Sequence, residues 1–297
     1  MGWYLVSHTL PRQNNIRTDS AIQLLFFFTL SPRPPLQSAS QARSGGAHRI
    51  ELCANLAQGG VTPSAGDIEG ALLAVRGSRT RVHVLIRPRP GDFVYSVLEK
   101  QVMEKDVSAA VKAGAHGVVI GALLEDGSID LETTERLMQV AKAAAAAAAS
   151  AATAAAKAAC SITFHRAFDC CTTDEITAME SLVRLGVDRV LTSGRHESAW
   201  DGRAVLSRLV EASGGRIGIL PGAGITHGNV KQLLLHTGAK EVHVGSACQE
   251  NVPTTALRED ATVCLGFAGE GSAAAGLKRV SAGRVSEMLT IIAEGMS

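Results

Sequence analysis

Four short β-rich segments of this chain each carry an ionisable side chain at a position that alternates with apolar residues. These side chains are Glu51 in "RIELC", Arg87 in "VHVLIR", His165 in "SITFHR" and His243 in "EVHVG". The apolar residues between them share the opposite face, because successive side chains of a strand point to opposite sides of a sheet. A carboxylate, imidazoles and a guanidinium in one cavity could transfer protons and hold an anion. We therefore predict Glu51, Arg87 and His165 as catalytic residues if the chain is an enzyme.

The loops that follow these segments add polar groups that could bind a substrate. One of them, the glycine turn "LPGAGI", presents backbone amides before a helix expected near Asn229, an arrangement that can hold an anion. The predicted substrate-binding residues are Arg89, Arg166, Asp169, Ser193, Gly222, Gly224 and His243.

Each of these residues also has a purely structural interpretation. Glu51 and Arg87 could form an ion pair that only sets the register of the strands, since an unpaired buried charge is costly. A histidine inside a sheet is often a hydrogen-bonded structural group, so His165 and His243 remain open between structure and function. His83 stands early in its segment, and we expect it to be structural.

The six cysteines are too sparse for a disulfide scaffold in 297 residues, which favours the reduced thiols of the cytosol. Four of them come at or just after predicted strand ends: Cys53, Cys170, Cys171 and Cys248. Thiolates and imidazoles together select Cu(I) or zinc. The alternative is that these cysteines are small buried apolar residues.

The elements that must position these groups alternate along the chain. Seven β-rich segments, most of them separated by helical patterns, begin near residues 48, 81, 117, 160, 188, 216 and 241. This order predicts an α/β protein with a parallel sheet, and specifically a (β/α)8 TIM-type barrel. The first strand would be "LLFFFTL", which could also be the core of a signal peptide. A doubly wound open sheet is the competing architecture, but no GxGxxG turn follows an early strand.

The remaining segments complete the predicted organisation. Residues 1–20 are expected to be a disordered or targeting segment, and 21–297 a single barrel domain with an alanine-rich insertion at 141–159. Residues 251–276 are typical of a loop, and 277–292 of a closing helix. A net charge of +1 argues against nucleic acid as a partner, and no apolar run reaches the roughly 20 residues that a membrane span needs.

Several longer motifs, in order along the chain, resemble the CutC family of copper homeostasis proteins. They include "GAHRIELC", "LAQGGVTPSAG", "VLIRPRPGDFVYS", "ITFHRAFD", "LGVDRVLTSG", "GRIGILPGAGI" and "EVHVGSA". The resemblance extends from about Leu36 to Ala247. It implies a (β/α)8 barrel, handling of Cu(I) in the cytoplasm and self-association into a homo-oligomer.

The chain departs from the family pattern at its start. The resemblance implies a first strand that carries a glutamate and a cysteine, but "LLFFFTLS" has neither. We therefore expect an atypical or poorly formed first strand, arising from an altered amino terminus or a faulty gene model. Cys53, at the end of the second strand, is the cysteine that remains as a predicted copper contact.

The sequence therefore leaves three hypotheses for the function of this protein. The leading hypothesis is a copper homeostasis protein that binds or handles Cu(I) through Cys53. The alternative is a barrel enzyme that acts on a small anionic or phosphorylated substrate at the carboxyl-end mouth of the barrel. A purely structural scaffold would show neither ligand nor activity.

Overall fold

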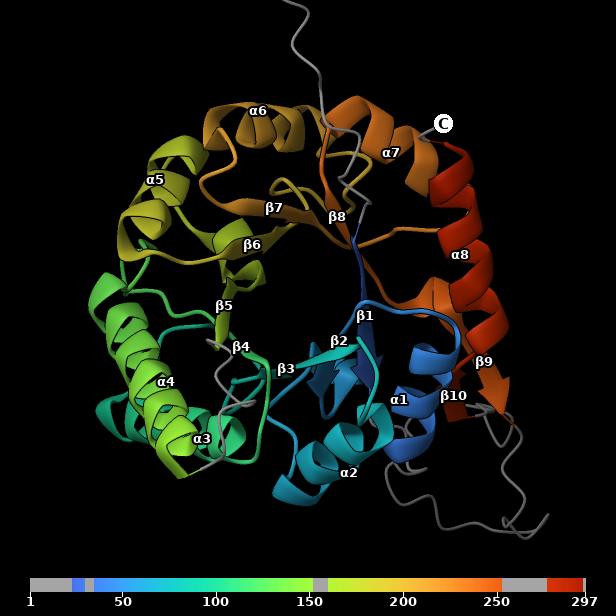
Figure 1. Cartoon of the computed structure of the whole chain (residues 1–297). Coiled ribbons are helices and arrows are strands. Elements are labelled where there is room, and N and C mark those ends of the chain that lie inside the picture. The colour runs from blue at the N-terminus through green and yellow to red at the C-terminus, as the bar shows by residue number, and fades with distance from the viewer. Residues whose placement is uncertain (1–22, 30–34, 152–159, 253–276, 296–297) are drawn as a thin grey trace, which may run out of the picture.

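A sheet of eight parallel strands forms the centre of the molecule, and helices surround it (Figure 1). The computed structural model describes residues 23–29, 35–151, 160–252 and 277–295. The strand order is β7-β6-β5-β4-β3-β2-β1-β8, and a parallel bridge between Gly222 and His243 joins β7 to β8. The sheet is therefore closed, which confirms the predicted (β/α)8 barrel.

Each strand is followed by a helix on the outside of the barrel. The strands are β1 (Gln23–Thr29), β2 (Arg49–Cys53), β3 (Arg81–Leu85), β4 (Gly117–Ile120), β5 (Ser161–Phe164), β6 (Arg189–Thr192), β7 (Gly218–Pro221) and β8 (Glu241–Val244). The helices are α1 (Pro35–Ser44), α2 (Ala65–Val75), α3 (Val97–Lys112), α4 (Leu131–Ala151), α5 (Glu175–Leu185), α6 (Arg203–Ser213), α7 (Val230–Thr237) and α8 (Ala282–Glu294). A short hairpin of β9 (Gln249–Val252) and β10 (Leu277–Val280) precedes α8.

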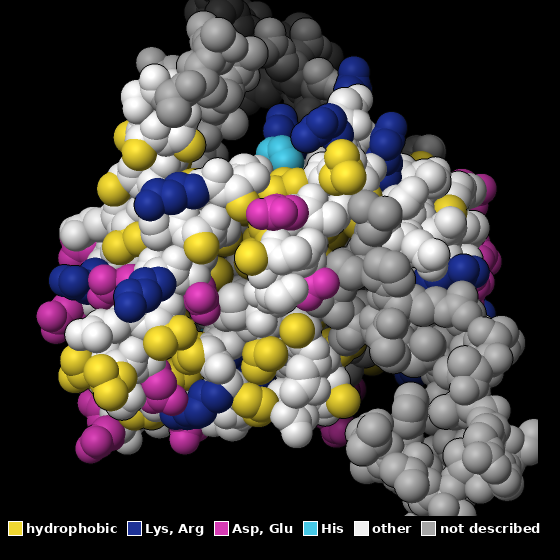
Figure 2. All heavy atoms as spheres, turned by 90° about the horizontal axis from the view of Figure 1, so that it is seen from below, with side chains coloured by type: hydrophobic (Ala, Val, Ile, Leu, Met, Phe, Trp, Pro, Cys, Tyr) yellow, Lys and Arg dark blue, Asp and Glu magenta, His cyan; other side chains and the backbone are white. Residues whose placement is uncertain are grey.

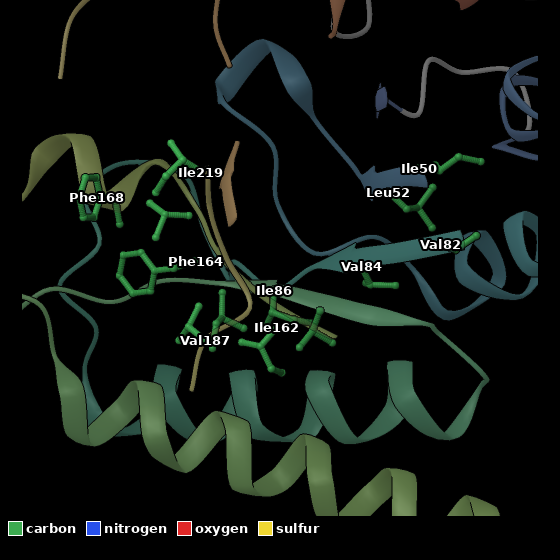
Figure 3. Close-up of a cluster of buried hydrophobic side chains, with 14 of the residues drawn as sticks. Ile50, Leu52, Val82, Val84, Ile86, Ile162, Phe164, Phe168, Val187 and Ile219 are labelled. Atoms are coloured by element: carbon green, nitrogen blue, oxygen red, sulfur yellow. The ribbon is translucent and has the colours of Figure 1, made fainter. Parts of the chain in front are cut away.

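The predicted alternation of side chains along the strands is confirmed. Apolar residues on one face of strands β2 to β8 pack in a continuous core between sheet and helices, part of which appears in Figure 3. Fully burying one such side chain contributes roughly 1.5–3 kcal/mol. This face includes Ile50, Leu52, Val82, Val84, Ile86, Ile162, Phe164, Val242 and Val244. The residues between them consequently face the interior of the barrel.

Local signals set where several helices begin and end. Ser64 at α2 and Ser96 at α3 each form a capping box, in which the serine and the residue three positions later bond to each other's backbone amides. Gly114, Gly186 and Gly238 all have positive φ just after a helix, the conformation in which glycine commonly ends helices.

The first strand is atypical in sequence, as expected, yet its backbone pairs on both sides. β1 aligns with β2 from Leu25 opposite Arg49 to Thr29 opposite Cys53, and it also pairs with β8. Backbone pairing depends on extended, β-prone residues rather than on a glutamate or cysteine, so the strand is not poorly formed. Thr29 therefore occupies the register position beside Cys53.

The carboxyl-terminal region differs from the sequence prediction. The closing helix is present, but it begins at Ala282, because residues 277–280 pair with β9 as an antiparallel strand instead. Residues 251 and 252 belong to that hairpin rather than to a loop. The alanine-rich segment is helical as far as Ala151. The segments 1–20, 152–159 and 253–276 lie outside the described residues.

The described surface carries charges of both signs. Figure 2 shows acidic and basic side chains interspersed with apolar ones over the face in view. In the part of the chain that the structure describes, no helix is both long enough and apolar enough to cross a membrane.

Candidate functional site

A pocket of about 320 Å³ lies at the ends of the barrel strands, and all four inward ionisable residues of the sequence analysis line it. Apolar groups make up most of the rest of its wall. The lining residues are Glu51, Leu56, Gly59, Leu85, Arg87, Phe93, His165, Arg166, Leu191, Ala223, Gly224, Ile225, His243, Gly245 and Ser246. A concave apolar pocket with a few convergent polar groups is the usual form of a small-molecule site.

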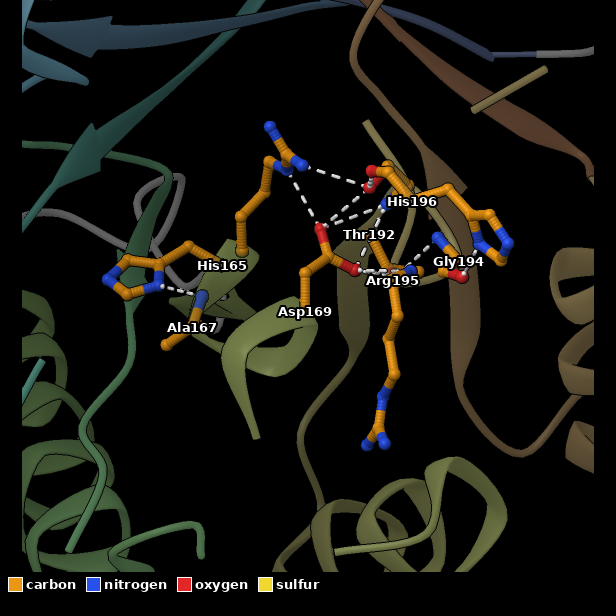
Figure 4. Close-up of polar contacts among 9 residues, drawn as sticks. His165, Ala167, Asp169, Thr192, Gly194, Arg195 and His196 are labelled. Carbon is orange, nitrogen blue, oxygen red and sulfur yellow. Dashed lines mark hydrogen bonds and ion pairs between the residues drawn. The ribbon is translucent and has the colours of Figure 1, made fainter. Parts of the chain in front are cut away.

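His165 is held as a neutral imidazole in one orientation. It follows β5, and its Nδ1 accepts a hydrogen bond of 3.1 Å from the backbone amide of Ala167 (Figure 4). Burial, and then the charge of Arg87, lower the pKa of His165 to about 3, so the ring is uncharged near neutral pH. Since Nδ1 accepts, the single ring proton is on Nε2. That Nε2 is buried without a hydrogen-bond partner among the described residues.

Glu51 is a fully buried carboxylate on β2. Its Oε2 lies 3.5 Å from Nε2 of His243 on β8, and neither carboxylate oxygen has a hydrogen bond within the described part of the chain. A buried carboxylate without hydrogen bonds is costly, and sites that carry one are commonly functional.

Arg87 does not form the register-setting ion pair with Glu51 that the sequence left open. Its guanidinium donates to the backbone carbonyls of Gln58, Gly60 and Gly91 at 3.2, 2.9 and 2.7 Å. It also lies over the ring of Phe93, 5.0 Å from the centroid. Neutral carbonyls do not cancel its charge, and no carboxylate of the described residues pairs with it within 4 Å. The pocket wall therefore contains a buried guanidinium that has carbonyl partners but no carboxylate partner among the described residues.

Arg166 extends the positive side of the pocket towards solvent. Asp169 anchors it through an ion pair of 2.8 Å to Nε, and Ser193 Oγ accepts from its Nη2 at 2.9 Å. Asp169 also accepts hydrogen bonds from the backbone amides of Ser193 and Arg195 and from the hydroxyl of Thr192, as Figure 4 shows. Asp169 and Ser193 do not line the pocket; they position Arg166 and the loop after β6.

The glycine turn after β7 reaches the pocket at Gly224 but not at Gly222. The amide of Gly222 donates to the carbonyl of Thr192, which removes it from the predicted anion site. The amides of Gly224 and Ile225 donate to no described residue, and both residues line the pocket. Ala223 has φ of 82°, a left-handed conformation that normally favours glycine, so this turn carries backbone strain.

Arg89 lies outside the pocket. Its guanidinium pairs with Asp92 in the loop after β3 and with Glu99 in the first turn of α3, which keeps it at the surface. Sequence position alone could not distinguish it from Arg87, because both follow β3 and the direction of each side chain depends on the loop.

The four cysteines that follow strand ends in the sequence do not form a cluster, because they lie in different environments. Cys53 packs inside the barrel with Leu85 and Val119, whereas Cys171 and Cys248 belong to the core under the helices and Cys170 is exposed. No group of three or more histidine, cysteine, aspartate or glutamate side chains in the described residues could hold a metal ion. Burial, together with the charge of Glu51, raises the pKa of the Cys53 thiol well above its usual value.

Sequence reasoning missed several residues that shape the pocket. Phe93 stacks beside His165 with ring centroids 5.0 Å apart, and Leu191 and Ile225 complete the apolar wall. Gly121 is also required, since a Cβ there would lie 2.4 Å from Cε1 of His165. Phe93 belongs to the motif "VLIRPRPGDFVYS", but no sequence signal distinguishes an apolar loop residue that lines a site from one that does not.

The opposite end of the barrel interior is structural. Glu241 accepts from Arg49 at 2.5 Å and from Arg189 at 2.8 Å, which links β8 to β2 and β6. His83 is buried at this end, and burial lowers its pKa well below the usual value, as does the nearby Arg49. This agrees with the structural role expected for His83, because ion pairs at the amino ends of barrel strands serve stability.

Known proteins share both the sequence pattern and the barrel. The model of the CutC family matches residues 35–248, which runs from the first residue of α1 to the end of the loop after β8. The chain belongs to the CutC family. Its β1 lies before the matched range, in agreement with the atypical first strand. Every lining residue of the pocket falls within the part that is typical of CutC proteins.

Individual CutC proteins support this assignment. The CutC family protein of Parabacteroides distasonis is 41% identical over 210 residues, covering 71% of this chain and 79% of the relative. The human copper homeostasis protein cutC homolog is 43% identical over 208 residues, covering 70% and 69%. The crystal structure of CutC from Streptococcus agalactiae is similar with a TM-score of 0.65 and 32% identity, covering 76% of this chain and 98% of that one.

Proposed function

We propose that this protein binds a small anionic molecule in the pocket at the mouth of its barrel. The single observation that carries the proposal is the guanidinium of Arg87, buried in the pocket wall with carbonyls but no carboxylate beside it among the described residues. Arg166 and the amides of Gly224 and Ile225 stand around the same space. Loops after the seventh and eighth strands commonly bind phosphate groups in barrels of this type.

The size and lining of the pocket define the ligand further. A volume of about 320 Å³ suits a compound of a few carbon atoms. Its apolar wall of Leu85, Phe93 and Leu191 would contact the carbon skeleton, while the arginines and amides would hold the charged end. A small phosphate monoester or a small carboxylate meets both requirements.

Replacing Arg166 with glutamine tests the proposal. We expect the wild type to bind ribose 5-phosphate saturably in calorimetry, and the R166Q variant to bind it roughly 10- to 100-fold more weakly, because a charged hydrogen bond contributes about 1.5–3 kcal/mol. Arg184→Gln, on the exposed side of α5, is the matched control and should bind like the wild type. Absence of saturable binding at constant ionic strength, or equal affinity in R166Q, would contradict the proposal.

Relatives in this family are named copper homeostasis proteins. We therefore make a second proposal, that this chain binds Cu(I) in the cytosol through Cys53. The sulfur of Cys53 adjoins Gly60, whose carbonyl holds Arg87, so the thiol lies just behind the pocket wall. The described residues do not form a complete Cu(I) site: Cu(I) requires at least a second soft ligand, and the register neighbour of Cys53 on β1 is Thr29.

Cys53→Ser is expected to lower the affinity for Cu(I), measured by competition with a chromogenic Cu(I) chelator under reducing conditions. Because the pKa of the thiol is raised, wild-type affinity should increase with pH, by up to tenfold per unit, as the proton becomes easier to release. Cys170→Ser, which removes an exposed thiol, is the control. If the C53S variant binds Cu(I) as tightly as the wild type, Cys53 is not the contact.

Self-association is proposed on the same family basis. Val97 and Leu98, at the start of α3, are 72% and 73% exposed, which is unusual for adjacent aliphatic side chains. Such an apolar surface favours contact with another copy of the chain.

A further inference from the structure

We propose that the pocket catalyses proton transfer at the carbon next to a carbonyl group, interconverting small phosphorylated hydroxy-aldehydes and hydroxy-ketones. Glu51 acts as the base and the Nε2–H of His165 polarises the carbonyl oxygen. The inference rests on the proposed anion pocket and adds its reaction class and substrate class. No redox partner or other co-reactant is needed.

The orientation of His165 suits it to donate rather than to accept a hydrogen bond. The amide of Ala167 occupies Nδ1, so the proton is on Nε2, which is buried at the pocket without a partner among the described residues. A ring whose pKa is lowered to about 3 cannot serve as a base near pH 7, and it remains a neutral donor. The rings of Phe93 and Phe164, 5.0 and 6.0 Å away, hold it in place.

Glu51 has the complementary properties of a base. Both carboxylate oxygens are buried and accept no hydrogen bond from the described residues, so their lone pairs remain available. A glutamate base paired with a neutral histidine is the arrangement that triosephosphate isomerase uses for this type of reaction.

The proposed step balances within the pocket. Glu51 removes the proton from the carbon beside the carbonyl, and that C–H electron pair forms the C=C bond of an enediolate. The π electrons of the carbonyl move to its oxygen, where the Nε2–H of His165 stabilises the charge. A proton moves between the two oxygens, and Glu51 returns its proton to the former carbonyl carbon. His243, 3.5 Å from Glu51, lies where it can assist the proton shift between the oxygens.

Isotope exchange tests the inference directly. The protein is incubated in D2O with dihydroxyacetone phosphate, ribulose 5-phosphate or fructose 6-phosphate, and proton NMR follows loss of the C–H signal next to the carbonyl. Binding of the same compounds is measured separately by calorimetry. We expect exchange with at least one compound that binds.

Variants show which side chains carry the exchange. Glu51→Gln should lower the exchange rate by about 10²- to 10⁴-fold, and His165→Gln by about 10²- to 10³-fold, while both still bind the phosphate compound. Glu135→Gln on α4 and His236→Gln on α7, both exposed and remote from the pocket, are the matched controls and should exchange like the wild type. Because all variants are purified in the same way, these two also show whether a contaminating isomerase causes the exchange.

The outcomes separate the two proposals. If the wild type binds these compounds but exchanges none of them, the reaction class is wrong while the anion pocket stands. If the E51Q variant exchanges at the wild-type rate, Glu51 is not the base and the proposed reaction of this pocket is wrong, while the anion pocket again stands. If the wild type binds none of them, the anion pocket is wrong and the reaction class fails with it.

Discussion

Replacing Asp169 with alanine is expected to lower the free energy of unfolding by about 3 kcal/mol, with a matching loss of anion binding. The carboxylate has only 8% of its side-chain surface exposed and accepts from Thr192, Ser193, Arg195 and Arg166. Without it, two backbone amides of the loop after β6 lose their partner, and each orphaned donor costs about 1–3 kcal/mol. Arg166 is 44% exposed, so its ion pair contributes less than the amides do.

Urea unfolding and calorimetry with ribose 5-phosphate measure the two effects. Asp201→Ala is the control, since Asp201 is exposed and its carboxylate bonds only to Ser198 in the described residues. It should change stability by about 0.5 kcal/mol or less. A stability loss in D169A no larger than in D201A would show that the Asp169 network does not support the loop.

Gly121→Ala is expected to destabilise the protein by about 1–3 kcal/mol and to displace His165. The added Cβ would lie 2.4 Å from Cε1 and 2.5 Å from Nδ1 of that ring, closer than atoms can approach. The ring is confined by Phe93 and by its bond from Ala167, so it can move only by giving up that bond. Exchange activity should therefore fall with stability.

Two further variants separate this clash from a general effect of replacing glycine. A Cβ added to Gly70 on α2 would have no neighbouring atom within 4 Å, so Gly70→Ala should stabilise the helix by roughly 0.5–1 kcal/mol. Combining Gly121→Ala with His165→Ala removes the obstructing ring, and the double variant should be less destabilised than the sum of the two single ones. Additive losses in thermal and urea unfolding would exclude a clash with His165.

The two proposed functions meet at Glu51. Its charge contributes to the raised pKa of Cys53, and it faces the pocket together with His243. Neutralising it in E51Q should thus ease deprotonation of the thiol while removing the base of the exchange reaction. A single side chain thus links the proposed copper contact to the proposed reaction.

Alternation along the strands was sufficient to predict which residues face the barrel interior. Ile50 and Leu52 are buried towards the helices and Glu51 towards the pocket, because strand periodicity is a property of the local backbone. The same reasoning placed Arg87, His165 and His243 in one cavity. The loops were less predictable. Arg89 lies at the surface, and the amide of Gly222 donates a hydrogen bond to the carbonyl of Thr192.

Analysis of the sequence was enough to predict the barrel, the inward set of Glu51, Arg87, His165 and His243, and the family of this protein. These follow from periodicity and motif order, which are local along the chain. Three features required the folded structure: His165 is a neutral donor, Arg87 lacks a carboxylate partner among the described residues, and Cys53 lies apart from the other described cysteines. Protonation and pairing depend on burial and on neighbours distant in sequence, so they appear only once the strands have closed into a barrel.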